Sequence, residues 1–316
     1  MNWIKNLKLS FVEKVKETFK RKRPSKKEQS DSMWVNCPGC NQMKLRQDLK
    51  KKFNVCDCSH HFDLDPKILF TDLLFDDGDW EKIPCPPANP DPLNFKINET
   101  KYIDKYNTYI KKTGQDSAIL AGKGTINGLK IIAFGYNFSF GGNAMTPREN
   151  EQLLSGIQMA MDEKVDAVIS IYQSGGMSVA CGMFGLVTMP KQMFAMRELR
   201  KTGIVTIGIL ESKITGGTFC NTYGNDFLFS SSPKNVSQLF AGARVSASVN
   251  KSQPLPEDFG VSSSLQNSGQ IDGCFNSRLE IREKITNLLR VLLKKPEKES
   301  KEESTSNVKV AVSASS

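Results

Sequence analysis

The sequence predicts an α/β domain preceded by a small cysteine-rich module. From Ala118 onward, apolar runs typical of strands alternate with segments of helical periodicity, which predicts the α/β class. Pairs of glycines lie in the turns between these segments. Four of the eight cysteines lie in two pairs between residues 37 and 58, which predicts the separate module.

The composition indicates a folded protein with a sizeable core. The chain has 316 residues, of which 39% are hydrophobic and 18 are Phe. That length suits one large domain or two modest ones. No run reaches the roughly 18 apolar residues that a membrane helix requires, and no signal peptide is recognisable. We therefore expect a soluble, intracellular protein without a membrane span.

The net charge of +9 is concentrated at the N-terminus. Residues 1–30 hold ten Lys or Arg residues and three Glu residues, so the rest of the chain is close to neutral. Within residues 1–23, apolar residues recur at helical spacing among the basic ones, which predicts an amphipathic basic helix. Such a helix packs on the rest of its own protein or frays, or it binds a partner or a membrane surface. Residues 24–32 follow as a linker.

These features divide the chain into four expected parts. Residues 294–316 are charged and then Ser-rich, which is typical of a disordered tail. Residues 63–115 are expected to form helices and loops that lead into the regular α/β pattern. The parts are a basic arm with its linker at 1–33, the cysteine module at 34–62, the main domain at 63–293, and the tail at 294–316.

The main pattern begins with a hairpin and a helix. Residues 118–140 contain two apolar strand runs on either side of Asn127-Gly128, a dipeptide typical of two-residue hairpin turns. A helix is predicted for residues 146–164, because a Thr-Pro start precedes a period near 3.6 residues.

Strands and glycine turns continue the pattern. Turns at the ends of strands carry the functional loops of α/β domains, so we expect the site in these turns. In chain order the predicted elements are strand 165–172, glycine turn 173–182, helix 189–203, strand 204–210, glycine turn 214–219 and strand 226–231.

The paired cysteines predict a structural metal site. Cys37 and Cys40 form a C-x-x-C knuckle, and Cys56 and Cys58 follow after an interval of fifteen residues. Two thiolate pairs at this separation are typical of a zinc ribbon, because zinc takes four tetrahedral nitrogen or sulfur ligands. Four thiolates leave no open position for a substrate, so the metal is expected to be structural.

The second cysteine pair leaves the fourth ligand open. One residue separates Cys56 from Cys58 where a knuckle has two, and two histidines follow directly. His60 or His61 is therefore an alternative to Cys58 as a ligand. A module that has lost tight metal binding is the other alternative.

Several motifs along the chain are similar to those of one known family. They are WVNCPGC, LKKKFNVC and HHF in the cysteine module, the lead-in from DPLNFK to KIIAF, and FSFGGNAM, SGGMSVACG, ITGGTF and FAGARV. Together they resemble the beta subunits of the bacterial and plastid acetyl-coenzyme A carboxylase carboxyltransferase. The resemblance covers roughly residues 34–293.

The chain departs from the family pattern beside the glycines. The family's Ser-Gly-Gly-Ala-Arg-Met-Gln-Glu corresponds to residues 174–181, which lack the Arg and the acid. Its Thr-Asp-Pro-Thr corresponds to residues 211–214, and the Pro of its Ala-Gly-Pro-Arg is Ala243. A paralogous carboxyltransferase with altered acyl-CoA selectivity is therefore one alternative function.

The resemblance implies a fold, a reaction and partners. The fold is a crotonase-like α/β spiral of ββα units with a four-cysteine zinc ribbon that holds one structural Zn²⁺ per subunit. The reaction transfers carboxyl from carboxybiotin on a carrier protein to acetyl-CoA and gives malonyl-CoA for fatty acid biosynthesis. The implied partners are an alpha subunit in an alpha2beta2 heterotetramer, biotin carboxyl carrier protein and biotin carboxylase, in an ATP-dependent, nucleotide-binding complex of the cytoplasm or plastid stroma.

The resemblance also implies the site residues. The reaction forms a thioester enolate, whose negative oxygen paired backbone N–H groups can hold where glycine permits close approach. By match to the family, Gly216 and Gly217 are the expected oxyanion donors. The expected substrate-binding residues are Ser174, Gly175, Gly176, Gly141, Gly142 and Arg244. Both histidines of the chain lie in the cysteine module, so a Ser-His-Asp or Cys-His catalyst is not expected.

A non-enzymatic alternative depends on the N-terminal arm. A zinc ribbon next to a strongly basic segment can bind nucleic acid through salt-dependent phosphate contacts. In that alternative the main domain is a catalytically degenerate scaffold. The ribbon offers few aromatic side chains for base stacking, apart from Phe53 and Phe62.

Overall fold

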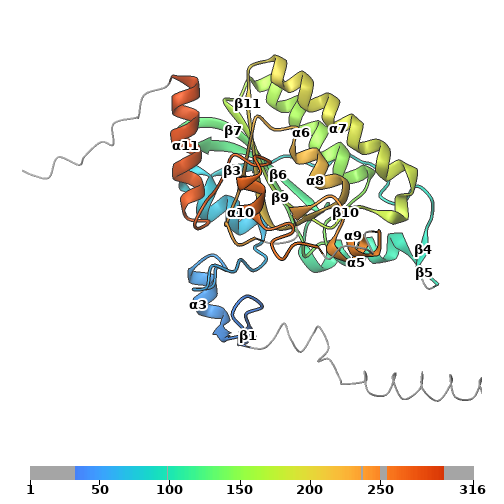
Figure 1. Cartoon of the computed structure of the whole chain (residues 1–316). Coiled ribbons are helices and arrows are strands. Elements are labelled where there is room, and N and C mark those ends of the chain that lie inside the picture. The colour runs from blue at the N-terminus through green and yellow to red at the C-terminus, as the bar shows by residue number, and fades with distance from the viewer. Residues whose placement is uncertain (1–32, 98, 236–237, 250–254, 295–316) are drawn as a thin grey trace, which may run out of the picture. The chain divides into compact units, whose positions relative to one another are not determined.

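The computed structural model describes residues 33–97, 99–235, 238–249 and 255–294 (Figure 1). The chain divides into two compact units, residues 1–62 and residues 63–316. The predicted amphipathic helix and nearly all of the predicted tail lie outside the described residues. Among the described residues, no helix has the length and apolar character needed to cross a bilayer.

The first unit is a small ribbon around the paired cysteines. Strands β1 (Trp34–Asn36) and β2 (Met43–Leu45) pair antiparallel, and helix α3 (Arg46–Lys51) follows directly. A single bridge between Val55 and His61 closes the second loop. The small core contains Leu49 and the cysteines.

The second unit is built on one eight-stranded sheet. Seven strands lie in the order β14-β12-β11-β9-β7-β6-β3, and β13 pairs with β11. The pairs β3–β6 and β6–β7 are antiparallel, whereas β7, β9, β11, β12 and β14 run parallel. The strands are β3 (Trp80–Lys82), β6 (Ile119–Ile126), β7 (Leu129–Tyr136), β9 (Ala167–Ser174), β11 (Val205–Thr215), β12 (Phe227–Ser230), β13 (Gln238–Leu239) and β14 (Gly273–Cys274).

Helices and two small sheets surround this sheet. The small sheets are β4 (Lys96–Ile97) with β5 (Thr100–Lys101), and β8 (Ala144–Met145) with β10 (Gly176–Met177). The helical segments are α4 (Pro66–Leu69), the π-helix η1 (Phe70–Leu74), the 3₁₀ turns η2 (Asp76–Gly78) and η3 (Val179–Cys181), and α5 (Tyr102–Thr113), α6 (Pro147–Glu163), α7 (Met183–Lys201), α8 (Gly216–Thr222), α9 (Ala243–Val249), α10 (Ser262–Asn267) and α11 (Glu280–Leu293).

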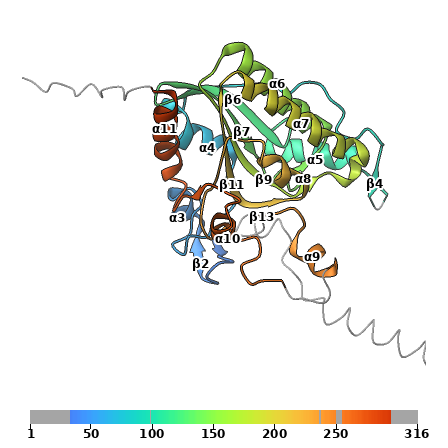
Figure 2. The ribbon, with the colours of Figure 1, turned by 45° about the horizontal axis from the view of Figure 1, so that its top comes forward.

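Helices cover both faces of the sheet. Consecutive strand residues point to opposite faces, and in β7 the ring of Phe134 lies against Gly156 of α6. The next residue, Gly135, lies against Pro66 and Phe70 at the start of α4 and η1. Both views show α6 beside α7, with α11 on the other side of the sheet (Figures 1 and 2). The core therefore forms two layers, one on each face.

The predicted hairpin and helix start are confirmed. Ile126 pairs with Leu129, and Asn127 and Gly128 form the turn with φ of 47° and 78°. Thr146 is the N-cap of α6, and its side chain and that of Glu149 form a capping box.

The predicted start of α7 and the predicted end of β11 are wrong, and two further elements were not predicted. Helix α7 begins at Met183, six residues before the predicted start at Met189. Strand β11 extends to Thr215, and helix α8 lies between the second glycine turn and the next strand, where no helix was predicted. Residues 63–115 include strand β3, which joins the edge of the main sheet.

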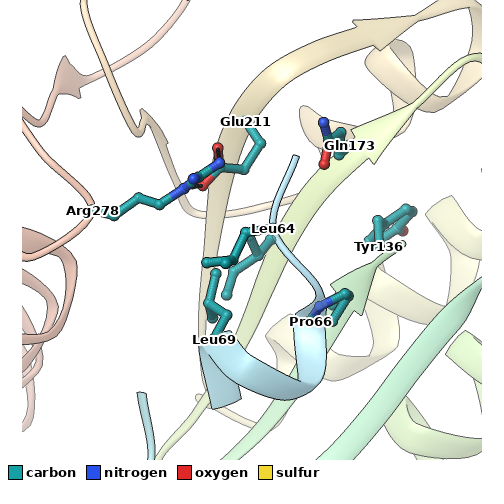
Figure 3. A pocket seen from close by; sticks show the side chains of 9 residues that line it. Leu64, Pro66, Leu69, Tyr136, Gln173, Glu211 and Arg278 are labelled. Atoms are coloured by element: carbon teal, nitrogen blue, oxygen red, sulfur yellow. Dashed lines mark hydrogen bonds and ion pairs between the residues drawn. The ribbon is translucent and has the colours of Figure 1, made fainter. Parts of the chain in front are cut away.

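A buried ion pair lies near the C-terminal ends of strands β9 and β11. Arg278 and Glu211 face one another next to a cavity of about 10 Å³ that is also lined by Leu64, Tyr136 and Gln173 (Figure 3). A space of that size holds about one water molecule. This cavity is therefore too small for a substrate.

Candidate functional site

Three glycine turns meet at one end of the sheet. We name residues 141–145 the first glycine turn, residues 174–178 the second and residues 214–218 the third. The amide of Gly175 donates to the carbonyl of Gly142 at 2.8 Å, which joins the first turn to the second. β8 pairs with β10 in the same region. The three Gly-Gly pairs predicted from the sequence are thus brought together.

The second and third turns are in direct backbone contact. A Cβ added at Gly176 would lie 3.0 Å from the carbonyl oxygen of Thr215 and 3.4 Å from Cα of Gly216. Gly176 also has a φ of 102° and Gly216 a φ of 63°, which side chains disfavour. Only glycine at position 176 permits this approach.

Ser174 links the three turns through one hydroxyl. Its Oγ donates to the carbonyl of Asn143 at 2.6 Å, accepts from the amide of Gly176 at 3.0 Å, and lies 3.1 Å from Oγ1 of Thr218. A hydroxyl offers one proton and two acceptor positions, so this hydroxyl is saturated. Ser174 is also 0% exposed. Ser174 thus supports the three turns, and its predicted role in substrate binding stays a prediction.

The third turn begins helix α8. Gly216 and Gly217 are its first residues, so their amides have no acceptor within the helix. The Thr215 side chain, the N-cap, makes no capping hydrogen bond. The register of β11 against β9 shifts between Leu210 and Ile214. Such an irregularity bends the strand near its end.

The second turn has fewer amides to offer a ligand. The Gly175 amide is engaged by Gly142, and the Gly176 amide by Ser174. Backbone donation to a substrate oxygen is therefore better served by Gly216 and Gly217. Residues 176–177 form β10 and η3 follows, so no helix begins directly after Gly176 and α7 begins at Met183.

Apolar side chains pack on two of the glycine turns. Met189 of α7 and Met177 of β10 pack against Gly217, and the ring of Tyr109 covers Gly141. Lys213 is exposed and its Nζ lies 5.5 Å from the ring centroid of Phe138. Neither histidine of the chain belongs to the second unit. The setting suits main-chain electrostatic stabilisation better than acid–base chemistry by a side chain.

Arg244 is the remaining predicted substrate-binding residue. It lies in α9, but its side chain is outside the described part of the structure. Its proposed contact with the substrate stays a prediction.

The four paired cysteines form a cluster in the first unit. Their sulfurs lie within 4.8 Å of one another, with Cys37 and Cys58 3.7 Å apart and Cys40 and Cys56 3.9 Å apart. Four sulfurs about 2.3 Å from a central zinc would be about 3.8 Å apart. The cluster therefore has the dimensions of a tetrahedral zinc site.

Neither histidine belongs to this cluster in the described ribbon. The ring of His60 makes an edge contact with Phe62, with centroids 5.1 Å apart, and His61 is buried. A Cβ added at Gly39 would lie 2.9 Å from Cβ of His60 and 3.2 Å from Sγ of Cys58. Glycine thus lets the two loops of the ribbon approach closely.

The thiols of Cys37, Cys56 and Cys58 differ in their tendency to ionise. Burial raises the pKa of Cys37 and raises the pKa of Cys56 to about 12. Burial acts on Cys58 in the same direction, but a hydrogen bond from the backbone of His60 and the neighbouring thiols lower its pKa overall. A metal ion binds the thiolates and therefore competes with these protons.

Two residues of the site were not predicted. Thr218 and Asn143 contact Ser174 from the third and first turns, although they are 44 and 31 residues away along the chain. The only sequence signal is that each follows a Gly-Gly pair.

Comparison with known proteins gives one consistent family. Residues 93–314 match the carboxyl transferase domain family. The beta subunit of the acetyl-coenzyme A carboxylase carboxyl transferase of Brucella ovis is 30% identical over 298 residues, covering 94% of this chain and 96% of the relative. The corresponding subunit of Pelagibacter ubique is 33% identical over 297 residues, covering 93% of each.

Solved structures support the fold. Transcarboxylase 12S with hydrolysed methylmalonyl-coenzyme A bound has a TM-score of 0.54 at 18% identity, over 71% of this chain and 40% of that chain. A Pseudomonas malonate decarboxylase hetero-tetramer in complex with malonate has a TM-score of 0.54 at 12% identity, over 74% and 82%. The predicted crotonase-like α/β fold is thereby confirmed. Because the sequence match extends over nearly the whole length of both partners, the chain belongs to the family of acetyl-coenzyme A carboxylase carboxyl transferase beta subunits.

Proposed function

We propose that the chain is the beta subunit of an acetyl-CoA carboxylase carboxyltransferase that makes malonyl-CoA. In this reaction the C–N bond between the carboxyl group and the ureido nitrogen of biotin breaks, and a C–C bond forms at the acetyl methyl carbon. The methyl proton passes to the ureido nitrogen. The biotin arrives on a carrier protein, so it is a substrate supplied in trans.

One observation carries the proposed mechanism. The third glycine turn begins α8 without a side-chain cap, at the place where three glycine turns meet. We assign the amides of Gly216 and Gly217 to the thioester oxygen, which becomes negative in the enolate. Each such donor typically lowers the barrier by roughly 3–4 kcal/mol. Gly141, Gly142, Gly175 and Gly176 shape the adjoining walls of the acyl pocket.

The proposed cofactor of the first unit is one structural zinc ion. Cys37, Cys40, Cys56 and Cys58 would hold it, since their sulfurs have tetrahedral spacing. When bound, the ion would stabilise the ribbon, which has a very small core of its own.

An apolar face of α7 supports an alpha subunit as partner. Met183, Leu186, Val187 and Phe194 recur at helical spacing and are 48–69% exposed, whereas the covered side of α7 includes the polar Thr188 and Gln192. Contiguous exposed apolar patches often mark interaction sites. Because Met189 of the same helix packs on Gly217, a partner bound here would lie beside the third glycine turn.

The remaining partners follow from the same assignment. Biotin carboxyl carrier protein and biotin carboxylase would complete an ATP-dependent complex, with the carboxyltransferase as an alpha2beta2 heterotetramer in the cytoplasm or plastid stroma. Nucleic-acid binding stays a prediction that depends on the basic arm, which lies outside the described residues.

Carboxyl transfer in the reverse direction tests the proposal. The chain is purified with an alpha subunit and supplied with malonyl-CoA and biocytin, and acetyl-CoA formation is measured. Activity with malonyl-CoA is expected. Activity confined to longer carboxyacyl-CoA substrates would instead indicate a paralogue with altered acyl selectivity, and inactivity with all of them would exclude the proposed function.

A further inference from the structure

A pair of hydroxyl groups connects the third glycine turn to the other two. The single proton of the Ser174 hydroxyl is donated to the carbonyl of Asn143, which can only accept. The proton in the 3.1 Å contact between Ser174 and Thr218 must therefore come from Thr218. Thr218 thus donates into a hydroxyl that already holds the first and second turns.

Both side chains are shielded from solvent and come from different elements. Ser174 ends β9 and is 0% exposed, and Thr218 lies in the first turn of α8 and is 1% exposed. Hydrogen bonds in such surroundings are specific, because a buried hydroxyl without a partner costs free energy. The contact therefore selects one placement of the start of α8.

The start of α8 needs such a contact. The helix has seven residues and Thr215 does not cap it. Farther along α8, Asn221 donates to Gln192 of α7, and Thr222 donates to Phe219 within its own helix. The Asn221 bond holds the far end of α8 to α7, whereas Thr218 lies directly after Gly217.

We infer that Ser174 and Thr218 are a positioning pair that fixes the Gly216–Gly217 amides relative to the first and second glycine turns. The inference rests on the proposed function, in which those amides hold the enolate oxygen. Neither hydroxyl touches the substrate. The pair acts through the main chain of the third turn, so its loss changes transition-state stabilisation more than substrate binding.

Three matched variants of Thr218 and Thr222 test the inference in the complex with the alpha subunit. Thr218→Val keeps the shape and removes the donor, and Thr218→Ser restores it. Thr222→Val is the control, because Thr222 is also buried in α8 but its hydroxyl donates to Phe219 of the same helix. We expect Thr218→Val to lower kcat for carboxyl transfer from malonyl-CoA to biocytin roughly tenfold or more, with KM changed less than about twofold. Thr218→Ser and Thr222→Val are expected to stay within about twofold of the original kcat.

Hydrogen exchange provides a readout that does not need activity. Amides of residues 214–219 are expected to exchange faster in Thr218→Val than in Thr222→Val. The comparison is made under conditions in which the two variants have the same free energy of unfolding. Equal exchange and equal kcat in the two valine variants would overturn the inference. A rise in KM at unchanged kcat would also overturn it, since the hydroxyl would then be a substrate contact. If the original complex has no activity while exchange responds as expected, the proposed function fails and the positioning role stands.

Discussion

Arg278 and Glu211 form a two-point ion pair in the interior, with Nε of Arg278 3.0 Å from Oε1 and Nη2 2.7 Å from Oε2. Their side chains are 1% and 3% exposed (Figure 3). The pair joins the segment before α11 to strand β11, at a position five residues before α8 begins at Gly216. Removing one member of such a pair leaves the charge of the other in the interior.

Removing one partner of this ion pair should destabilise the second unit. Arg278→Met is expected to lower the free energy of unfolding by about 3–5 kcal/mol, because Glu211 is left without its cation. Urea denaturation measures the change. Glu198→Gln is the control, since the ion pair of Glu198 with Lys201 is more than half exposed and its loss should have no measurable effect. Equal stability of the two variants would contradict the prediction.

Asp76 should make stability depend on pH in the acid range. Burial opposes its ionisation, but the amides of Gly128 and Asn127, the Thr125 hydroxyl and Arg282 outweigh burial and lower its pKa. A lowered pKa in the folded state means that the stabilisation is present above the unfolded value of about 3.9 and is lost as pH falls through the folded value.

The variant Asp76→Asn tests this pH dependence. At neutral pH it should be less stable by about 2 kcal/mol, since it loses charge-assisted hydrogen bonds to the hairpin turn. The difference should shrink as the pH of denaturation falls below about 4. Asp77→Asn serves as the control, because Asp77 is an exposed neighbour. A difference that is the same at pH 7 and pH 3 would rule out the ionised carboxylate as its source.

The fourth zinc ligand can be decided by substitution. Cys58→Ser should lose most of the bound zinc, whereas His60→Ala and His61→Ala should retain about one zinc per chain, because the described cluster contains four sulfurs and neither ring. Metal analysis of the purified chains gives the result. Cys220→Ser, at an exposed cysteine outside the ribbon, controls for loss of a thiol. Zinc retained by Cys58→Ser and lost from either histidine variant would reverse the assignment.

Added bulk at Gly217 should impair the reaction. A Cβ there would lie 2.1 Å from Sδ of Met189 and 3.0 Å from Cγ of Met177, so the turn or the methionines must move. Gly217→Ala is expected to lower kcat roughly 100-fold in the reverse assay. Adding Met189→Ala should recover part of this loss by giving the methyl group space.

Gly114→Ala is the control for the Gly217 variant. Gly114 ends α5 in the left-handed region with open space around its Cα, so alanine there should cost about 1 kcal/mol in stability and leave kcat unchanged. Wild-type kcat in Gly217→Ala would exclude the third turn as the oxyanion site.

The apolar face of α7 should control partner binding. Phe194→Glu is expected to weaken association with the alpha subunit at least roughly tenfold, because the charge would be desolvated in the interface. The isolated chain should keep its melting temperature, since Phe194 is 64% exposed. Analytical ultracentrifugation measures the association. Val291→Glu on α11, at a residue 77% exposed, is the control. Equal association in both variants would place the partner elsewhere.

Short sequence motifs correctly predicted those features of the fold that depend on interactions between residues close together in the chain. The Asn127-Gly128 turn and the Thr146 cap depend on conformations and hydrogen bonds within a few residues, and both are correctly placed. The start of α7 is misplaced because Pro190 resembles a first-turn proline, although it lies inside the helix. The exposed apolar face of α7 also weakens the amphipathic pattern on which such predictions rely.

The candidate site was predictable in its residue types and not in its contacts. Glycine pairs indicate turns that let a backbone approach a ligand, and the resemblance supplied their roles. The contact of Gly176 with Gly216, and that of Ser174 with Thr218, arises only because parallel strands β9 and β11 lie side by side. Such long-range contacts leave no periodic signal in the sequence.

The main sheet ends on both sides in very short strands. β3 has three residues and β14 has two, whereas the central β11 has eleven. Unpaired strand edges are templates on which another polypeptide can add a strand, and short edges offer few hydrogen-bonding positions for this. Association by sheet extension, including the kind that leads to aggregation, is therefore disfavoured at both borders of this sheet.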